Sequence, residues 1–597
     1  MNQNKKLMTP ALIVLLSIFT LSLVGLWYVY LVMPPVYIEE FRIGDREPDL
    51  KGTGEPITPY LIETIYDLEE FAFAVNNGSS YRGKHFLLTA DINMTDYLSS
   101  SGAGYNDGAG WIMIGRHNGT SFSGYFDGGG HTISGLWINR PDEISTGLFA
   151  WLYEAEIYNL NVEATTIVTE SDAGTLAGTV WDGKIANCSS TIENISSTNP
   201  EFKNYLGGLV GFQRFDSIIE NCRATTNAEF HAEDLQLSFG GLVGSSSENS
   251  RIINSHSIVN LEIHSDERIW VGGLVGDISD EVVIDNSYSV GNVKATGDGF
   301  AYVGGLMGES YGDAIVKNSY SECTVIGSGA TGGLIGFQKL SSVITDSYAT
   351  GDISVVSVQN EYAFVGGLVG ESQSDIKNSY ATGNVLAEGD INVRAGGLVG
   401  RMVGGEISDC FATGDVNITK GDDTEAGGLV GRIERNGVIR QSYATGNVSA
   451  FGSELVRVGG LVGCQTGYEG ETPLIENCYA TGSISGDALW YYYTGGLVGV
   501  QGTVGSIINS YAIVEMNTNN QNSGGLIAWQ LGKVENCYFD AQILGVERAS
   551  NRDEENAIGE GNAKTTAQMQ TQETFIDWDF DNIWYMPEEG GAPELRK

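Results

Sequence analysis

Glycine and apolar residues alternate with polar segments in a unit that recurs along most of the chain. One copy is Gly272-Gly-Leu-Val-Gly276, in which glycines enclose two apolar residues. The first glycine of the unit falls at Gly207, Gly240, Gly272, Gly304, Gly332, Gly366, Gly396, Gly427, Gly459, Gly495 and Gly524. Two degenerate copies precede these, at 146–150 and 174–178. A period of about thirty residues predicts a solenoid, in which each repeat forms one coil and buries its apolar residues against its neighbours.

A second block lies between the glycine units and has the residue pattern of short strands. One copy is Ile284-Asp-Asn-Ser-Tyr288 and another is Ile376-Lys-Asn-Ser-Tyr380. The strand-like segments are bounded by Gly and Asn, and no helical period of useful length intervenes. Helical repeats are therefore poor fits, and propeller blades would need about forty residues and four strands each. We predict an all-β fold, a parallel β-helix (β-solenoid) of about 13 coils with short capping elements.

Two positions of the second block repeat so regularly that we expect them to form ladders. The Asn ladder comprises Asn159, Asn187, Asn221, Asn254, Asn286, Asn318, Asn378, Asn477, Asn509 and Asn536, with Asp346, Asp409 and Gln441 as variants. The aromatic ladder comprises Tyr288, Tyr320, Tyr348, Tyr380, Phe411, Tyr443, Tyr479, Tyr511 and Tyr538. Asn tolerates the left-handed conformation of a sharp corner, and its amide can bond the next coil. Aromatic rings facing solvent could stack on glycans, but we favour the structural interpretation, in which the rings stack on one another.

The N-terminal region has the pattern of a membrane anchor. Residues 1–10 are polar and include Lys5 and Lys6, and residues 11–33 are an uncharged run long enough to span a bilayer core of ~30 Å. Lysines before the run and glutamates after it place the N-terminus inside the cell. We therefore predict a single-pass protein of the cell membrane with most of the chain extracellular. A cleaved signal peptide remains the alternative.

The rest of the chain divides at changes in this pattern. Apolar residues at helical spacing over 65–75 predict a helix that caps the first coil, and the Trp/Phe-rich tail 575–584 reads as a C-terminal cap. Strand-like segments are expected at 84–88, 111–114 and 122–133, where Asp127-Gly128 is either a strand reversal or a coil corner. The expected divisions are a cytoplasmic N-terminus at 1–10, an anchor or uncleaved signal at 11–33, a linker at 34–58, an N-terminal cap with the first strands at 59–145, the repeats at 146–540 and a C-terminal cap at 541–597.

Composition narrows the classes of partner. The formal net charge of −43 disfavours nucleic acid and suits a soluble extracellular surface, for example in high salt. The seven cysteines are too few for a disulfide scaffold of this size. Five share one repeat position, where we expect small inward side chains: Cys188, Cys222, Cys410, Cys478 and Cys537. Cys188 and Cys222 would stack in adjacent coils about 5 Å apart, which permits a disulfide without requiring one.

The repeat resembles a known family. Gly-Gly-Leu-Val-Gly alternating with Ile-x-Asn-Ser/Cys-Tyr-Ala-Thr-Gly is similar to the GLUG-motif repeats of exported bacterial and archaeal proteins, over roughly residues 60–597. The resemblance implies a right-handed parallel β-helix on adhesin-like cell-surface proteins, some of which accompany an immunoglobulin-A-cleaving metallopeptidase. That activity does not carry over, because the six histidines never form the His-Glu-x-x-His motif that such a zinc site needs.

The sequence singles out no catalytic, cofactor-binding or metal-binding residue. Ser310 lies in a Gly-x-Ser-x-Gly pattern, but Gly308 is the last glycine of a repeat unit, and the related copy reads Gly370-Glu-Ser-Gln-Ser374. His131 stands alone in a turn, where a structural hydrogen bond is expected. Parallel β-helices also carry polysaccharide lyases and glycoside hydrolases, and such a site would need two or three converging carboxylates. With 75 acidic residues, chance pairs arise, so none is selected.

We therefore predict a membrane-anchored surface protein that acts as an adhesion, binding or structural module. The alternative is a polysaccharide-active enzyme on the same scaffold. The expected partners are the membrane through residues 11–33, and surface glycans or other cell-surface proteins through the variable loops 293–303, 353–365 and 464–474. Sequons fit an exported glycoprotein and occur at Asn77, Asn93, Asn118, Asn187, Asn194, Asn417 and Asn447.

Overall fold

The structure is a computed structural model that describes residues 47–116, 119–232, 234–297, 299–356, 362–517, 522–550 and 562–596. The chain divides into two compact units, Met1–Glu47 and Pro48–Lys597. The predicted membrane segment 11–33 lies outside the described residues. Within the described ranges, no helix is both long enough and apolar enough to cross a bilayer.

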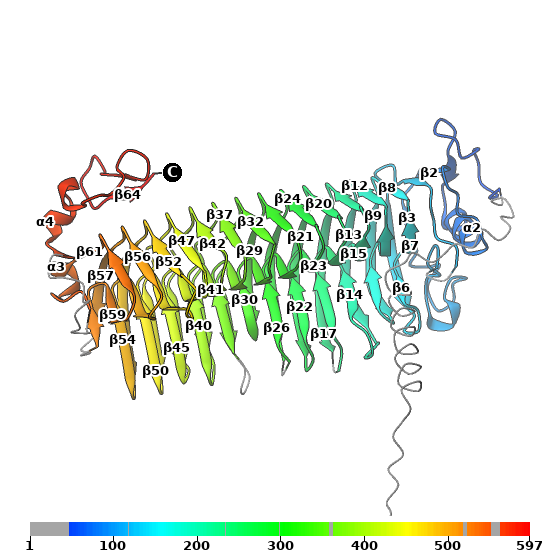
Figure 1. The fold of residues 1–597 in the computed structure, drawn as a ribbon. Helices are drawn as coiled ribbons and strands as arrows, with labels where there is room; N and C mark the ends of the chain where they lie inside the picture. Colours follow the sequence, from blue (N-terminus) through cyan, green and yellow to red (C-terminus); the bar gives the residue numbers. More distant parts are fainter. Residues whose placement is uncertain are drawn as a thin grey trace, which may run out of the picture. The chain divides into compact units, whose positions relative to one another are not determined.

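The second unit is a parallel β-solenoid in which each coil contributes to four sheets (Figure 1). One representative coil consists of β35 (Ala363–Gly366), β36 (Val369–Ser372), β37 (Asp375–Lys377), β38 (Tyr380–Ala381) and β39 (Val385–Glu388). We number the sheets by their place in the coil. Sheet 1 contains β35, sheet 2 contains β36, sheet 3 contains β37, and sheet 4 contains β38 and β39. Every strand pairs in parallel with its equivalent one coil away, for example Phe364 with Arg394.

The sheets extend along most of the unit. Sheet 1 runs from β6 (Ser145–Thr146) to β58 (Ser523–Gly524), and sheet 2 runs from β7 (Phe149–Tyr153) to β59 (Ile527–Gln530). Each has thirteen strands, which make about twelve complete turns, close to the predicted 13 coils. Sheet 3 has sixteen strands, from β1 (Tyr60–Ile62) to β60 (Lys533–Glu535). The predicted all-β parallel solenoid is confirmed.

The glycine unit forms the corner between sheets 1 and 2. A Cβ atom on Gly367 would lie 2.0 Å from the carbonyl oxygen of Gly397 in the next coil. A Cβ on Gly370 would lie 2.5 Å from the backbone nitrogen of Thr331 in the preceding coil. Real Cβ contacts are never this short, so these positions admit only glycine. The corner is therefore a place where the backbones of successive coils and of the two sheets meet directly.

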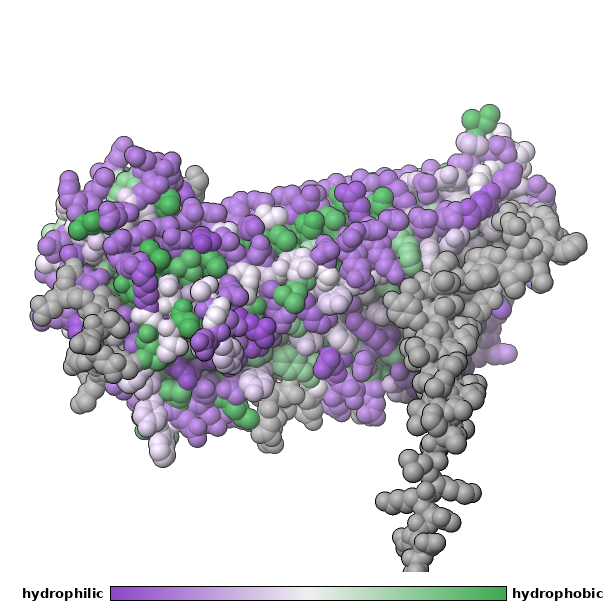
Figure 2. Space-filling model, in the orientation of Figure 1, coloured by the Kyte–Doolittle hydropathy of each residue, from purple (hydrophilic) through white to green (hydrophobic). Residues whose placement is uncertain are grey.

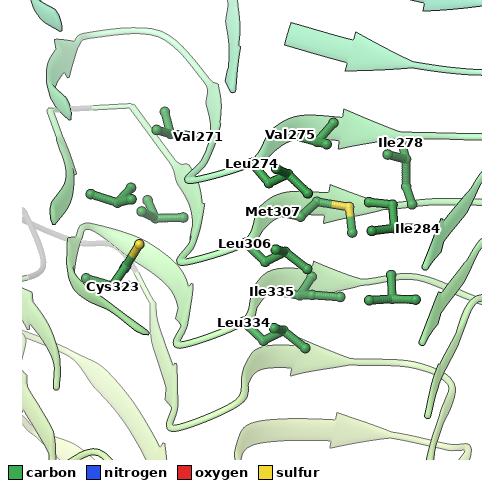
Figure 3. Packing of buried hydrophobic residues seen from close by; sticks show 14 of the residues in the cluster. Val271, Leu274, Val275, Ile278, Ile284, Leu306, Met307, Cys323, Leu334 and Ile335 are labelled. Atoms are coloured by element: carbon green, nitrogen blue, oxygen red, sulfur yellow. The ribbon is translucent and has the colours of Figure 1, made fainter. Parts of the chain in front are cut away.

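The apolar residues of the unit point inward and stack between coils. Figure 3 shows Leu274, Leu306 and Leu334 above one another in successive coils, and all three are fully buried. The backbone N–H groups of Leu274 and Val275 both donate to the carbonyl oxygen of Leu306, at 2.8 and 3.0 Å. The stack thus buries one aliphatic column while it satisfies the backbone of the corner.

The Asn ladder forms a second corner, between sheets 3 and 4. Its thirteen residues all have φ between 44° and 56°, the left-handed region that Asn tolerates well. Asn286 Nδ2 donates to Asn254 Oδ1 at 2.7 Å, as predicted. The following residue points inward, and the N–H of Ser287 donates to Ser319 Oγ of the next coil at 3.1 Å. Cysteines at this position are buried and unbridged, including the neighbours Cys188 and Cys222.

The first coils are closed by helix α2 (Ile65–Asn76), the helix predicted from the apolar spacing. Thr64 and Asp67 form a capping box at its start, and Phe71 on its buried face contacts Phe86 and Phe122 at centroid distances of 4.3 and 5.2 Å. This aromatic contact covers apolar surface that an open first coil would expose.

Two local predictions at this end are resolved by the strand pairing. Asp127-Gly128 is a coil corner and not a reversal, because β4 (Tyr125–Asp127) and β5 (Thr132–Asn139) belong to different parallel sheets. The strand predicted at 111–114 was wrong: Ile114 makes only a single bridge, to Phe149. Trp111, Met113 and Ile114 are buried in a loop while Ile112 is exposed, an arrangement that the apolar pattern alone could not distinguish from a strand.

The C-terminal segment folds against sheet 4. It contains α3 (Ala541–Leu544), α4 (Thr566–Met569), a 3₁₀ turn at Gln572–Thr574 and the antiparallel pair β63 (Trp584–Tyr585) and β64 (Glu594–Leu595). Its side chains Met569, Phe575, Trp578 and Trp584 form a buried cluster with the last three members of the aromatic ladder. Those members are Tyr479, Tyr511 and Tyr538.

Alanine at the corner should be costly even though it adds a single methyl group. We expect Gly367→Ala to destabilise the solenoid by about 3 kcal/mol, because the new Cβ meets backbone that cannot move away as a side chain can. Gly502→Ala is the matched control, since its Cβ would find ordinary contacts at 3.4 Å. Urea unfolding of the full-length variants measures both. Equal stability of the two variants would contradict the corner constraint.

Candidate functional surfaces

The aromatic ladder is a continuous stack whose ring faces are occupied. From His256 to Tyr511, successive ring centroids lie 4.7–5.1 Å apart and the planes differ by only 2–6°. Each internal ring is therefore covered on both faces, and only ring edges reach solvent. A sugar that stacks needs an open face, so the structural interpretation of the ladder is confirmed. Tyr538 leaves the stack and contacts Phe575 and Trp578 instead.

The stack begins at a histidine that was not recognised in the sequence as a member of the ladder. His256 occupies the ladder register, opposite Tyr288, and its ring is parallel to that tyrosine at 4.7 Å. The earlier coils carry Arg223, Ser189 and Asn161 at this position, so the column of rings stops. The signal was present in the sequence, because His256 follows Ser255 as each ladder tyrosine follows a serine or a cysteine.

A recess of about 310 Å³ lies where the rings stop, and we call it the ladder-end recess. It is lined by Asn161, Asn187, Cys188, Ser189, Asn221, Cys222, Arg223, Asn254 and His256. Ser189 Oγ donates to Asn161 Oδ1 at 2.6 Å, and Asn221 Nδ2 donates to Asn187 Oδ1 at 3.2 Å. Burial raises the pKa of the Cys188 thiol, and the neighbouring Cys222 adds to the effect, so Cys188 is a protonated thiol and not a nucleophile.

A second depression, of about 390 Å³, follows the turns between sheets 2 and 3. It is lined by Phe215, Asn249 and Gly312 and by five carboxylates from successive coils: Asp216, Glu248, Asp280, Glu281 and Asp313. Glu248 accepts two hydrogen bonds of 3.0 Å from Arg214. Across the part of the chain that the structure describes, no three His, Cys, Asp or Glu side chains are grouped closely enough to hold a metal ion. We call this surface the acidic depression.

The outward side chains that flank the glycine corner form hydrogen bonds and ion pairs with one another. Trp270 Nε1 donates to Glu309 Oε2 at 2.7 Å. Further along, Glu425 is 1% exposed and forms ion pairs with three guanidinium groups: those of Arg394 at 3.2 Å, Arg432 at 2.6 Å and Arg457 at 2.7 Å. A buried carboxylate surrounded by three guanidinium groups is a structural element, because its charge is already compensated within the protein.

Asp172 is the carboxylate of this corner that is held by hydroxyl groups instead of by an ion pair. It is buried, and it accepts hydrogen bonds from Ser171 Oγ at 2.7 Å and Thr179 Oγ1 at 3.3 Å. Burial raises the pKa of Asp172 to about 7, because the hydroxyl bonds only partly offset the cost of removing its charge from water.

The Asp172 shift makes stability depend on pH. The unfolded aspartate has a pKa of about 3.9, so between pH ~4 and ~7 the native state keeps a proton that the unfolded chain releases. The contribution is full below pH ~4 and is lost as the pH rises through about 7. In the parent protein, we expect the free energy of unfolding to fall by up to about 4 kcal/mol between pH 4 and 8, and Asp172→Asn should abolish this fall.

Urea unfolding at both pH values measures it, with the exposed Asp487→Asn as the control. If Asp172→Asn lost as much stability between the two pH values as the parent protein, the account would be contradicted.

Large apolar side chains are exposed on the turns, outside the repeat positions. Leu489, Trp490 and Tyr491 are 82%, 76% and 55% exposed at the turn from β53 (Tyr479–Ala488) to β54 (Tyr491–Gly495). We call residues 489–491 the aromatic turn. Apolar residues on the visible face occur as separate spots in a mainly hydrophilic surface (Figure 2). The exposed side chain of Trp490 is therefore a local feature of this turn and not part of a larger apolar surface on that face.

The variable loops leave the solenoid at two edges. Segments 293–303 and 353–365 connect sheet 4 to sheet 1, the edge that also carries the aromatic turn. Segment 464–474 connects sheet 2 to sheet 3, and its Tyr468 is 79% exposed. Of the described residues in these segments, Val356, Tyr362 and Tyr468 are exposed, whereas the apolar strand residues of segment 293–303 are buried.

The two residues weighed for chemistry in the sequence are structural and do not come together. Ser310 ends strand β27 (Met307–Ser310), is 1% exposed and bonds to Ser342 Oγ at 3.1 Å. No helix follows it, so it lacks the strand–turn–helix context of a nucleophile elbow. His131 Nδ1 lies 3.2 Å from Asp91 Oδ1, which is the structural hydrogen bond expected.

Comparison with known proteins supports the repeat assignment. The GLUG motif model matches residues 365–386, 391–417, 423–449 and 455–485, which confirms the predicted resemblance. The first match begins within β35, at the glycine corner, and continues through the Asn corner to the aromatic ladder. The motif is therefore the sequence of the two corners and of the strands between and after them.

Two relatives share part of the chain. Halomucin of Haloquadratum walsbyi is 32% identical over 170 residues, which is 28% of this chain and 2% of halomucin. A Gly-rich membrane protein of Evansella cellulosilytica is 35% identical over 148 residues, which is 24% of this chain and 15% of that protein. The chain therefore spans only a small part of either relative.

One solved structure aligns over most of the length. It is described as an immunoglobulin A1 protease from Bacteroides ovatus, and the alignment covers 91% of this chain and 94% of that one. The sequence identity is 14% and the TM-score is 0.24, which is too low for any argument about fold or activity.

Proposed function

We propose that this chain, which carries GLUG-motif repeats, is a cell-surface protein whose solenoid presents binding sites on its turns. The observation that carries the proposal is the aromatic turn, where Trp490 is 76% exposed on a chain of net charge −43. A tryptophan held in water on a soluble protein is costly unless a partner covers it, and tryptophan dominates many binding hot spots.

The contrast between the regular repeat positions and the variable turns supports a binding role. Most core, corner and ladder residues of the described chain are engaged in packing or hydrogen bonds, so the regular part of the repeat offers a ligand few free groups. The turns differ from coil to coil and carry the exposed aromatic side chains, as expected for an array that displays recognition loops on a rigid scaffold. We take the solenoid to be right-handed, the hand that parallel crossovers adopt in nearly all proteins.

We further propose that residues 11–33 anchor the chain in the cell membrane with the solenoid outside. The uncharged run and its flanking charges support this placement, and so do the names of the two relatives, halomucin and a Gly-rich membrane protein. Deletion of 11–33 should move the chain from the membrane fraction to the soluble fraction. Membrane fractionation and surface labelling test it, and recovery of the intact full-length chain in the cytoplasm would contradict it.

Trp490→Ala should weaken binding to the cells or glycans that the protein recognises. We expect a loss of at least about tenfold in affinity, because truncation of a central tryptophan removes most of a hot spot. Tyr66→Ala is the matched control, since Tyr66 is 65% exposed on helix α2, away from the variable turns. Labelled full-length protein on a glycan array and on whole cells gives the measurement. Undiminished binding by Trp490→Ala with no change in specificity would refute the role of the aromatic turn.

The enzymatic alternative has one observation in its favour. The acidic depression stacks carboxylates from successive coils, and coils are separated by about 4.8 Å. Glycosidases that retain configuration hold two carboxyl groups about 5 Å apart. Incubation with the same polysaccharides distinguishes the two functions: new reducing or unsaturated ends would establish catalysis, whereas binding without turnover supports the surface-module function.

A further inference from the structure

We propose that the ladder-end recess binds an acidic sugar, a pyranose unit that carries a carboxylate, as part of a glycan. The inference rests on the proposed binding function but concerns a different surface from the aromatic turn. It follows from the charge of the recess, from the interrupted Asn ladder, and from the end of the ring stack.

The recess is a cationic site on an acidic protein. The chain has 75 acidic and 32 basic residues, yet none of the nine residues lining the recess is Asp or Glu. Arg223 is exposed, and it forms no ion pair with any carboxylate in the described ranges of the chain. A guanidinium group presents a planar fork that matches a carboxylate, so an anionic group is the ligand that this side chain selects.

One of the unbonded steps of the Asn ladder lies at the same place; another lies between Asn286 and Asn318, where Asn318 Nδ2 donates to Asp285 instead. Asn221 Nδ2 donates to Asn187, and Asn286 Nδ2 donates to Asn254, but no bond joins Asn221 to Asn254 among the described residues. The Asn254 NH₂ group and the Asn221 amide oxygen therefore both lack a side-chain partner, and both residues line the recess. A free amide donor beside a free amide acceptor suits the vicinal hydroxyl groups of a sugar ring.

The ring stack supplies the apolar wall. One face of His256 is covered by Tyr288 at 4.7 Å, and its other face lies toward Arg223 and the recess, where no aromatic ring follows. Burial lowers the pKa of His256, and the charge of Arg223 lowers it further, so the imidazole is neutral at pH 7 and Arg223 carries the charge. The apolar C–H face of a pyranose can lie against such a ring.

The size of the recess favours a single sugar unit. Its volume of about 310 Å³ is at the lower end of the roughly 300–1,000 Å³ of small-molecule sites. The recess is open to solvent along the solenoid, so neighbouring units of the same glycan can continue beyond it. Recognition should therefore depend on one acidic residue in the chain and not on a long polymer.

The test uses full-length protein and calorimetric titration with short galacturonate oligomers at fixed low ionic strength. We expect binding to galacturonate at least about tenfold tighter than to the neutral galactose oligomer of equal length, because a charge-assisted bond contributes about that factor. Arg223→Ala should lose at least about tenfold in affinity. Arg268→Ala is the matched control, since Arg268 is also exposed but lies on the turn between β21 (His256–Ser265) and β22 (Ile269–Gly272).

Three results would overturn the inference: equal affinity of Arg223→Ala and the parent, equal affinity for the neutral oligomer, or displacement of the sugar by acetate at equal concentration, which would mark a simple anion site. Trp490→Ala separates this inference from the proposed function. It should retain galacturonate binding while it loses cell binding. Absence of galacturonate binding in a parent protein that still binds cells would reject the recess alone.

Discussion

The structure depends on direct backbone contact at the glycine corner. Gly367 and Gly370 let one coil approach both the coil above and the coil below more closely than any side chain would allow. The contact places each carbonyl oxygen within reach of two N–H groups, as at Leu306. The sharp corner sets the course of each coil, so the inward leucines and isoleucines meet in continuous columns. The remaining regularities of the chain follow from this constraint.

The same constraint explains why the most regular residues are the least informative about function. Stacking identical coils puts identical side chains next to one another, and each type then finds its partner within the molecule. Asn amides bond Asn oxygens, Ser hydroxyl groups accept from the next backbone, and tyrosine rings cover tyrosine rings. A ligand can use only positions where a ladder ends or a turn departs from the repeat. The ladder-end recess and the aromatic turn are two such positions.

Sequence pattern predicted the coil well because its period reports burial directly. The glycine corner, the left-handed Asn corner, the inward Ser/Cys position and helix α2 could all be assigned from spacing. Segment 111–114 could not, since an apolar alternation fits a buried loop as well as a strand. The recess was missed because it is defined by absent rings at Asn161 and Ser189, and because register between coils is needed to align them with His256.

The central claim is that the corner glycines are required by backbone contact while the turns are free to vary. A saturation substitution scan of one coil, residues 363–392, read out by resistance of the full-length chain to proteolysis, tests it most directly. The account predicts that Gly366, Gly367 and Gly370 tolerate no other residue, whereas positions 390 and 391 of the turn, which are partly exposed, accept most. Stable variants with alanine or serine at Gly367 would contradict the account.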